Sequence, residues 1–304
     1  MPNLNTLQYA QILQTALDQK AIQTMTTGWM DANAGQVKYT GGNEVKIPTI
    51  ATQGLANYGR ADQSGFVKGG VTLSYNTYTM TQDRGRLFML DRHDIDESNF
   101  IATSTQVMGT FQEENVVPEI DAYRISKLAS LATSGMTVDG YTPATGTIVE
   151  KIKTGIKNIR KQGYNGPLVC HISYDAQMVL ELEMGNKIQN TTFSSGGFNT
   201  TCPSIDGVPL IPTADTAMVT AITLYDGKSP SQEVGGFVKG SSAKDINFII
   251  MPTKVPIAVT KQDNMRIFSP DVNQSADAWQ MDYRRYHDLW VLENKKKLIF
   301  LNTK

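Results

Sequence analysis

The sequence contains few residues of the kinds that build cross-linked or reactive sites. Its 304 residues include only two cysteines, Cys170 and Cys202, and three histidines. The cysteine spacing matches no metal or redox motif, so we expect free thiols in a reducing compartment. No run reaches the ~18 apolar residues that a membrane span needs, and the first residues lack the basic and apolar regions of a signal peptide. We therefore expect neither secretion nor membrane contact.

An excess of one charge sign is also missing. The 28 basic and 29 acidic residues leave a formal net charge of −1. Such a balance argues against nonspecific binding to nucleic acid or acidic membranes as a main function. The composition that is present, 40% hydrophobic and 19% charged residues, is typical of a globular chain with a buried core. The length allows one large domain or two ordinary ones.

One segment concentrates ionisable side chains. Residues 90–100, LDRHDIDESNF, contain Asp91, Arg92, His93, Asp94, Asp96 and Glu97. Carboxylates around an imidazole suit a metal centre or acid–base catalysis. Asp94 followed by Glu97 is equally the N-cap and capping box of a helix. Because the spacing matches no ligand motif, we interpret the segment as a helix start, with a metal-dependent hydrolase as the minor alternative.

Residues 40–92 have the pattern of strands. VKIPTI precedes a stretch rich in Gly, Asp and Ser, and alternating apolar residues at 71–75 follow it. This pattern predicts a long two-stranded hairpin with a flexible tip. A shift of the large side chains predicts a bulge or a twist near Asn76. Both strands are too polar to form their own core, so the hairpin needs a partner elsewhere in the chain or in another copy.

Helical patterns flank this hairpin. Residues 4–25 predict an amphipathic helix whose apolar face needs a partner. Residues 94–131 stay helix-compatible, which at 1.5 Å per residue predicts a helix of about 55 Å. Pro118 is expected to kink or divide it, because proline removes a backbone donor. Two successive core helices are the alternative.

Residues 135–243 have an alternating pattern. After a loop, Thr147 and Glu150 form a capping box, and Gly163 ends the helix that they begin. PLVCHIS predicts a buried strand, residues 174–184 a second helix, and GVPLIPT another strand. This order predicts a compact α/β unit inserted into the rest of the chain.

The candidates for chemistry in this unit are weak. Cys170 and His171 are neighbours on a strand, so they face opposite sides of the sheet and cannot act as nucleophile and base. We expect a buried thiol and a surface histidine. SSGGF matches no phosphate-binding motif, which favours a flexible loop.

Residues 244–304 return to strand patterns, which predict one antiparallel sheet. Trp279, Met281 and Tyr283 alternate with polar residues, as on a half-buried strand. His287 and Asp288 diverge on a strand in the same way as the earlier pair, and no serine-nucleophile motif accompanies them. We expect the side chains of this strand to have packing or interface roles.

Four phrases and the order of the segments carry a family resemblance. The phrases are VKIP at the start of the hairpin, YTMTQDRGRLFMLDRHDIDES at its end, VVPEIDAYRISKLA in the long helix, and MRIFSPDVNQSADAWQMDYRRYHDLWVLENK near the C-terminus. Over nearly its whole length the chain resembles the major capsid protein of tailed double-stranded DNA bacteriophages. The resemblance implies an α+β fold with an N-terminal arm at 1–40, an extended β-hairpin loop at 41–92, a spine helix at 93–134, an inserted α/β axial domain at 135–243 and a peripheral antiparallel sheet at 244–304.

The resemblance also implies a structural role without catalysis, cofactor or metal. Copies would self-assemble into the hexamers and pentamers of an icosahedral head that encloses double-stranded DNA. A portal protein and nonspecifically contacted DNA would be partners, and the near-neutral charge would keep that contact weak. Because the arm begins almost at Met1, we expect a separate scaffolding protein. The chain would be made in the host cytoplasm and end in the virion; an encapsulin-like nanocompartment shell is the alternative.

Charged residues near the hairpin are the candidates for contacts between subunits. They are Arg60, Lys68, Arg84, Arg86, Asp91 and Arg92. The charged residues at the hairpin base can form ion pairs between subunits or within one subunit. The alternative is that they only form a solvent-exposed polar surface. Some members of the family form a Lys–Asn crosslink between subunits. Lys68 lies near the tip, but its Asn and Glu partners cannot be matched in the sequence, so we make no prediction of crosslinking.

Overall fold

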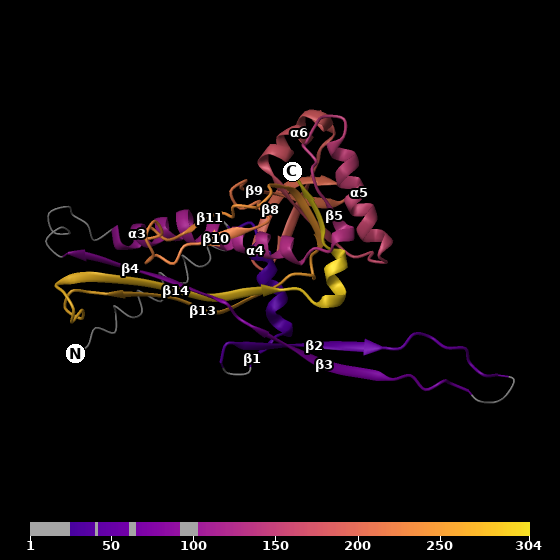
Figure 1. Ribbon diagram of the computed structural model, residues 1–304, viewed down its shortest axis with the longest axis horizontal. Coiled ribbons are helices and arrows are strands. Elements are labelled where there is room, and N and C mark those ends of the chain that lie inside the picture. Colours follow the sequence, from indigo (N-terminus) through magenta and orange to yellow (C-terminus); the bar gives the residue numbers. More distant parts are fainter. Residues whose placement is uncertain (1–24, 40–41, 61–64, 92–102) are drawn as a thin grey trace.

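The computed structural model describes residues 25–39, 42–60, 65–91 and 103–304. A central sheet carries two helices, long strands extend from it to one side, and a thin hairpin projects to the other (Figure 1). The predicted α+β mixture is therefore present.

The central sheet has seven strands. Their order is β5 (Thr137–Val138), β15 (Phe300–Thr303), β12 (Ile246–Pro252), β6 (Leu168–Ser173), β9 (Val208–Thr213), β8 (Phe198–Ile205) and β7 (Gln189–Ser195). The prediction that residues 244–304 form one antiparallel sheet is wrong, because β12 and β15 join the strands of residues 135–243. Every residue of β12 is buried, which requires a central strand covered on both faces. The boundary drawn at residue 243 thus passes through one sheet.

Helices α5 (Ile148–Lys161) and α6 (Tyr174–Met184) cover one face of this sheet. The isoleucine face of α5 is buried as predicted, and α6 has the predicted bounds, with Gly185 after it. The capping box of α5 is not formed. The Thr147 hydroxyl lies 2.9 Å from the Tyr141 hydroxyl and donates to the Ala144 carbonyl at 3.0 Å, so it caps no amide of the helix.

The opposite face of the sheet buries η1 (Gly28–Gln36), a 3₁₀ segment. His171 was predicted at the surface, but it is fully buried on this face. Its Nε2 accepts a hydrogen bond from Trp29 Nε1 at 3.2 Å, and Nδ1 lies 3.0 Å from Thr213 Oγ1. Because the indole can only donate, the ring is neutral with its proton on Nδ1.

The segment SSGGF is a tight hairpin turn between β7 and β8, which corrects the prediction of a flexible loop. Gly196 and Gly197 have φ angles of +59° and +86°, the left-handed pair that two-residue hairpins use. A Cβ on Gly196 would lie 2.9 Å from the Ala32 side chain, so the turn packs closely on η1.

The long helix consists of α3 (Thr103–Phe111), a π-helical turn η3 (Gln112–Val116) and α4 (Val117–Leu131). Helical backbone therefore runs through Pro118, and the irregularity predicted there takes the form of the π turn directly before it. The predicted helix at 4–25 and the start near Asp94 lie outside the described residues. No described helix is long and apolar enough to cross a membrane.

Three smaller sheets complete the structure. They are β13 (Ile257–Phe268), β14 (Ala278–Trp290) and β4 (Gln82–Asp91); β1 (Lys38–Tyr39), β2 (Glu44–Thr52) and β3 (Val71–Thr79); and β10 (Ile222–Leu224) with β11 (Phe237–Lys239). Short 3₁₀ segments η4 (Ser134–Met136), η5 (Gly185–Lys187) and η6 (Glu293–Leu298) connect strands and helices.

The hairpin is shorter than predicted. It ends at Thr79, because β4 leaves it and pairs with β14, where Phe88 and Leu90 pack into an apolar cluster with Tyr283. Of the bulge or twist predicted near Asn76, the bulge is not formed, since the β2–β3 register is unshifted along its whole length.

Filling the contact between α5 and the sheet should destabilise the fold. A Cβ on Gly155 would lie 2.7 Å from Phe300 and 2.8 Å from Ile250. We expect Gly155→Ala to lower the free energy of unfolding by about 1–3 kcal/mol, measured by urea denaturation of the unassembled chain. Gly135→Ala, where no atom lies within 4 Å of the new Cβ, is the control. Equal midpoints for both variants would contradict this packing.

The buried imidazole should make stability depend on pH. Burial lowers the pKa of His171 from 6.5 to about 3. Below pH 6.5 the unfolded chain binds a proton that the folded chain refuses, so the free energy of unfolding falls by up to about 1.4 kcal/mol per pH unit. Burial lowers the pKa of His287 as well, and that contribution remains in both proteins. We expect His171→Gln to show a shallower slope between pH 6.5 and 4.5; identical slopes would refute it.

Candidate functional site

The hairpin β2–β3 has two unlike faces. Directly paired residues point to the same side, so Pro48 with Tyr75 and Ile50 with Leu73 form one face. Ile50, Leu73 and Tyr75 are 67%, 56% and 46% exposed. This set, together with Val71 beyond it, is called the outer apolar face. The pairs on the reverse side at this distance are polar or small, such as Ala51 with Thr72.

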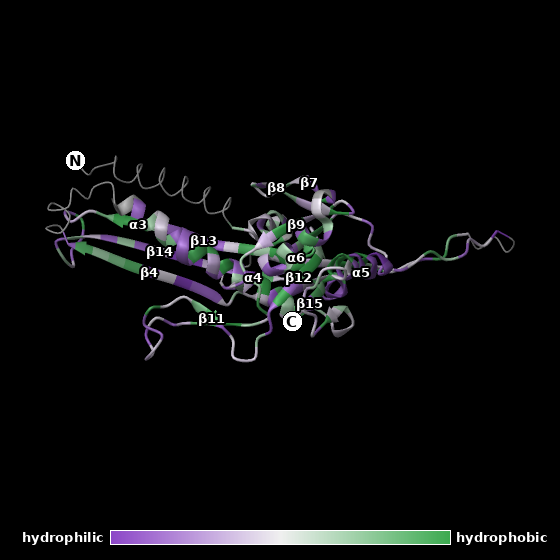
Figure 2. Ribbon diagram, turned by 90° about the horizontal axis from the view of Figure 1, so that it is seen from above, coloured by the Kyte–Doolittle hydropathy of each residue, from purple (hydrophilic) through white to green (hydrophobic). Residues whose placement is uncertain are grey.

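The base of the hairpin is anchored by the reverse side. Val45 and Ile47 are fully buried in a cluster with Met80, Val259 and Trp290. The base of the hairpin therefore packs against residues of the same chain, so only the rest of the hairpin still needs a partner. Toward the tip, residues 50–60 and 65–75 project away from the body of the molecule (Figures 1 and 2). The outer apolar face is thus exposed over the part of the hairpin that the structure describes.

One carboxylate fixes the point where the hairpin joins the body. Asp288 accepts hydrogen bonds from the Thr81 amide at 2.9 Å and the Thr81 hydroxyl at 3.0 Å. Thr81 lies between β3 and β4, where the chain passes from the hairpin to the sheet with β14. Tyr123 of α4 donates to the other Asp288 oxygen at 2.6 Å. Burial and this hydrogen bond raise the pKa of Tyr123, so the phenol stays protonated as a donor.

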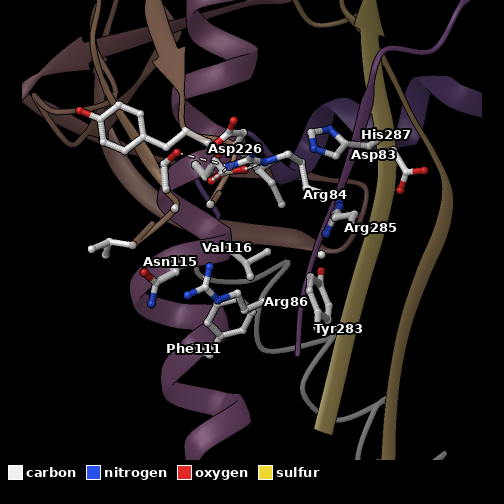
Figure 3. Close-up of a pocket in the computed structure, with 18 of the residues that line it drawn as sticks. Asp83, Arg84, Arg86, Phe111, Asn115, Val116, Asp226, Tyr283, Arg285 and His287 are labelled. Carbon is white, nitrogen blue, oxygen red and sulfur yellow. Dashed lines mark hydrogen bonds and ion pairs between the residues drawn. The ribbon is translucent and has the colours of Figure 1, made fainter. Parts of the chain in front are cut away.

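A pocket of about 300 Å³ lies between β4, the long helix and the loop 225–236 (Figure 3). Arg84 binds both oxygens of Glu119, at 2.7 and 2.9 Å, and donates to the carbonyls of Tyr225 at 2.7 Å and Gly236 at 3.3 Å. One guanidinium therefore ties both ends of the loop to the long helix. Arg84 therefore pairs within its own subunit. This is one of the two kinds of pairing expected for charges at the hairpin base, between subunits or within one.

The other charged candidates lie in different places. Arg86 spans the same pocket near Phe111 and Asn115, and both of its terminal nitrogens lie 3.4 Å from the Glu233 carbonyl (Figure 3). Arg60 and Lys68 are exposed near the tip of the hairpin. Asp91 is exposed at the end of β4, and Arg92 lies outside the described residues. Their roles in contacts between subunits stay predictions.

The ionisable groups that attracted a chemical interpretation do not converge. Cys170 and His171 face opposite sides of β6, as predicted, and both are buried. His287 packs its ring edge-on against Tyr123 at 5.6 Å, while Asp288 serves the hairpin junction. Among the described residues no three His, Cys, Asp or Glu side chains are placed to hold a metal ion. His93 and Asp94 are outside these residues.

Comparison with known proteins finds similar structures but no similar sequences. No family model and no curated protein sequence matches the chain. Solved structures do match. A chain from the capsid of cyanophage P-SCSP1u aligns with a TM-score of 0.57 and 9% identity over 88% of this chain and 84% of its own length. The mature capsid of bacteriophage PhiM1 gives 0.54 and 11% over 87% and 82%. A virus-like particle from Pyrococcus furiosus gives 0.52 and 11% over 97% and 99%.

The chain has the fold of phage capsid proteins. The resemblance stated from the sequence is therefore confirmed for the fold, in spite of identities between 9% and 11% in these three structures. This capsid fold is also present in the Pyrococcus particle.

Two features of the site were missed at the level of sequence. The clamp made by Arg84 depends on Glu119 and on carbonyls of residues 225–236, which are far apart in the chain. The role of Asp288 likewise depends on Thr81, more than 200 residues away. The outer apolar face did leave a signal, because residues 71–75 alternate, but only the register with β2 shows that Ile50 extends it.

Removing the clamp should destabilise the chain and loosen the loop. Arg84→Met would leave the Glu119 carboxylate and the Tyr225 carbonyl without the hydrogen bonds that Arg84 donates, which we expect to lower the free energy of unfolding by about 1–3 kcal/mol. Trypsin cleavage after the exposed Lys228 should become faster. Arg284→Met is a matched control, because Arg284 binds Asp83 with the same two-bond geometry in a more exposed position, where a pair contributes about 0–1 kcal/mol. Equal losses in both variants would refute the clamp.

Proposed function

We propose that the chain is the major capsid protein of a tailed double-stranded DNA phage. Copies assemble into hexamers and pentamers, and these close into an icosahedral head around the genome. The proposal assigns no catalytic step to the chain, and its work consists of repeated contacts between copies. The capsid fold supports this proposal, and the outer apolar face of the hairpin is the observation that carries it.

The physical argument rests on the exposed hairpin. Two strands without cover are marginal in water, and an apolar row that projects from a soluble body favours association. The base already uses the reverse side, where Val45 and Ile47 are buried. A neighbour must therefore approach the side that carries Ile50, Leu73 and Tyr75. In the proposed shell, the hairpin lies across an adjacent copy with this side inward.

The proposed partners follow from the shell. They are other copies of the chain, a separate scaffolding protein during assembly, a portal protein, and packaged DNA held without sequence preference. The formal net charge of −1 suits a wall that must not bind DNA phosphates tightly. The chain would be made in the host cytoplasm and reside in the virion.

Assembly should depend on the outer apolar face rather than on the hairpin as such. The purified chain, with co-expressed scaffolding protein where needed, should form shells, tubes or rings visible by negative-stain microscopy and light scattering. Ile50→Gln with Leu73→Gln should abolish or strongly reduce them, because two exposed apolar side chains that become buried each contribute about 1.5–3 kcal/mol. The melting temperature of the unassembled chain should change little.

The control changes the neighbouring pair on the reverse side. Ala51→Gln with Thr72→Gln places the same two side chains at a similar distance from the base, and it should assemble like the original protein. Normal shells from the Ile50 and Leu73 variant would show that the hairpin docks differently. A wild-type chain that remains a monomer or dimer even with scaffolding protein would overturn the proposed function.

A further inference from the structure

Helix α6 presents a second apolar row that the hairpin does not explain. Tyr174, Met178 and Leu182 follow one another at intervals of four residues and are 55%, 60% and 70% exposed. This spacing places them on one face of the helix. Asp175, which pairs with Lys304 at 3.1 Å, and Glu181 flank the row, and α6 contains acidic residues but no basic one. The row is therefore an apolar strip with an acidic border, the composition of an interface with a polar rim.

Helix α5 presents the opposite charge. Lys153, Lys157 and Lys161 are exposed on its outer side, again at intervals of four. Like charges at this spacing repel one another in an isolated helix. Lys153 has a partner in Asp206 at 3.2 Å, whereas no ion pair of Lys157 or Lys161 occurs within the described part of the chain. The outer side of α5 thus carries two positive charges, Lys157 and Lys161, that no ion pair compensates among the described residues.

The two rows lie on different helices of one domain. In Figure 1, α6 crosses the top of the central sheet and α5 runs down its right-hand side. Both rows are exposed, so they do not cover each other within one chain. Two different, complementary surfaces on one molecule are what a head-to-tail contact requires, and such contacts close into rings when the rotation is right.

We propose that α6 of one copy packs against α5 of the next copy in each ring. The aliphatic stems of Lys157 and Lys161 would lie on the row of Tyr174, Met178 and Leu182, with their ammonium groups toward the acidic border. This inference rests on the proposed function, because it names the contact that joins neighbours within a capsomer. A nucleic acid is the less suitable occupant, since the acidic residues of α6 would repel phosphates.

Charge reversal on one side should block the contact. Lys157→Glu with Lys161→Glu, or Asp175→Lys with Glu181→Lys, places like charges opposite each other. We expect about a tenfold or larger drop in the yield of rings at low salt for either pair of substitutions, because like-charge juxtaposition across an interface costs several kcal/mol. The loss should become smaller in high salt. Circular dichroism and melting of the unassembled chains confirm that each variant folds.

Reversing the charges on both helices should restore the contact between α5 and α6. A chain with all four substitutions again presents opposite charges and should form rings of five and of six. An equal mixture of the α5 variant and the α6 variant, each reversed on one side of the contact, allows a more specific prediction. Only alternating neighbours attract in that mixture, so rings of six should form and rings of five should not, because alternation cannot close around an odd number. Mass photometry and negative-stain class averages distinguish the two ring sizes.

Other results would overturn the inference and leave the proposed function standing. If the α5 variant and the α6 variant assemble like the original protein, or the variant with all four substitutions assembles no better than they do, α5 and α6 of neighbouring copies do not contact each other. Normal shells from the α5 variant that retain less DNA would assign the lysines to nucleic acid instead. Failure of the unmodified chain to assemble with scaffolding protein would reject the proposed function itself.

Discussion

Polar groups buried on one turn of α4 hold both the segment that covers the central sheet and the base of the hairpin. Arg124 has no exposed surface, and Asp121 is nearly as buried. Together they bind residues 25–31 through charged hydrogen bonds. Tyr123, on the same turn, binds Asp288 at the junction of the hairpin. A single turn of helix therefore positions the segment that covers the central sheet and the carboxylate that fixes the hairpin base.

Such a network specifies geometry more than it adds stability. Burial raises the pKa of Asp121, because desolvation disfavours the ionised carboxylate, whereas the hydrogen bonds from Thr26 and Thr27 favour it. Apolar residues of similar size could stabilise the core as well, but they would tolerate small rotations. Directional bonds from Arg124 and Tyr123 do not. A hairpin that is anchored only at its base needs this restriction, because a small rotation there becomes a large displacement at the tip.

The sequence predicts those parts whose signal is local. Helix α6 and strand β6 were predicted with nearly the observed bounds, because periodicity and a following glycine define them. Pairing between distant segments has no such signal, so the entry of β12 into the central sheet and the departure of β4 from the hairpin were missed. The burial of His171 depends on Trp29, 142 residues earlier in the chain. The residues that form the site were visible in the sequence, but their partners were not.

In the proposed shell, the two proposed contacts would divide the work of closing it. Pentamers and hexamers would use one surface at two different angles, which a tightly interdigitated apolar core resists because packed interiors deform little. Lysine stems lying on the strip of Tyr174, Met178 and Leu182 would be able to change their rotamers between the two rings, while charge attraction would keep the neighbours paired. The outer apolar face of the hairpin has no equivalent freedom at its base, where Asp288 holds it. Adaptable contacts near the ring centre combined with a rigidly directed hairpin would let one chain serve both positions.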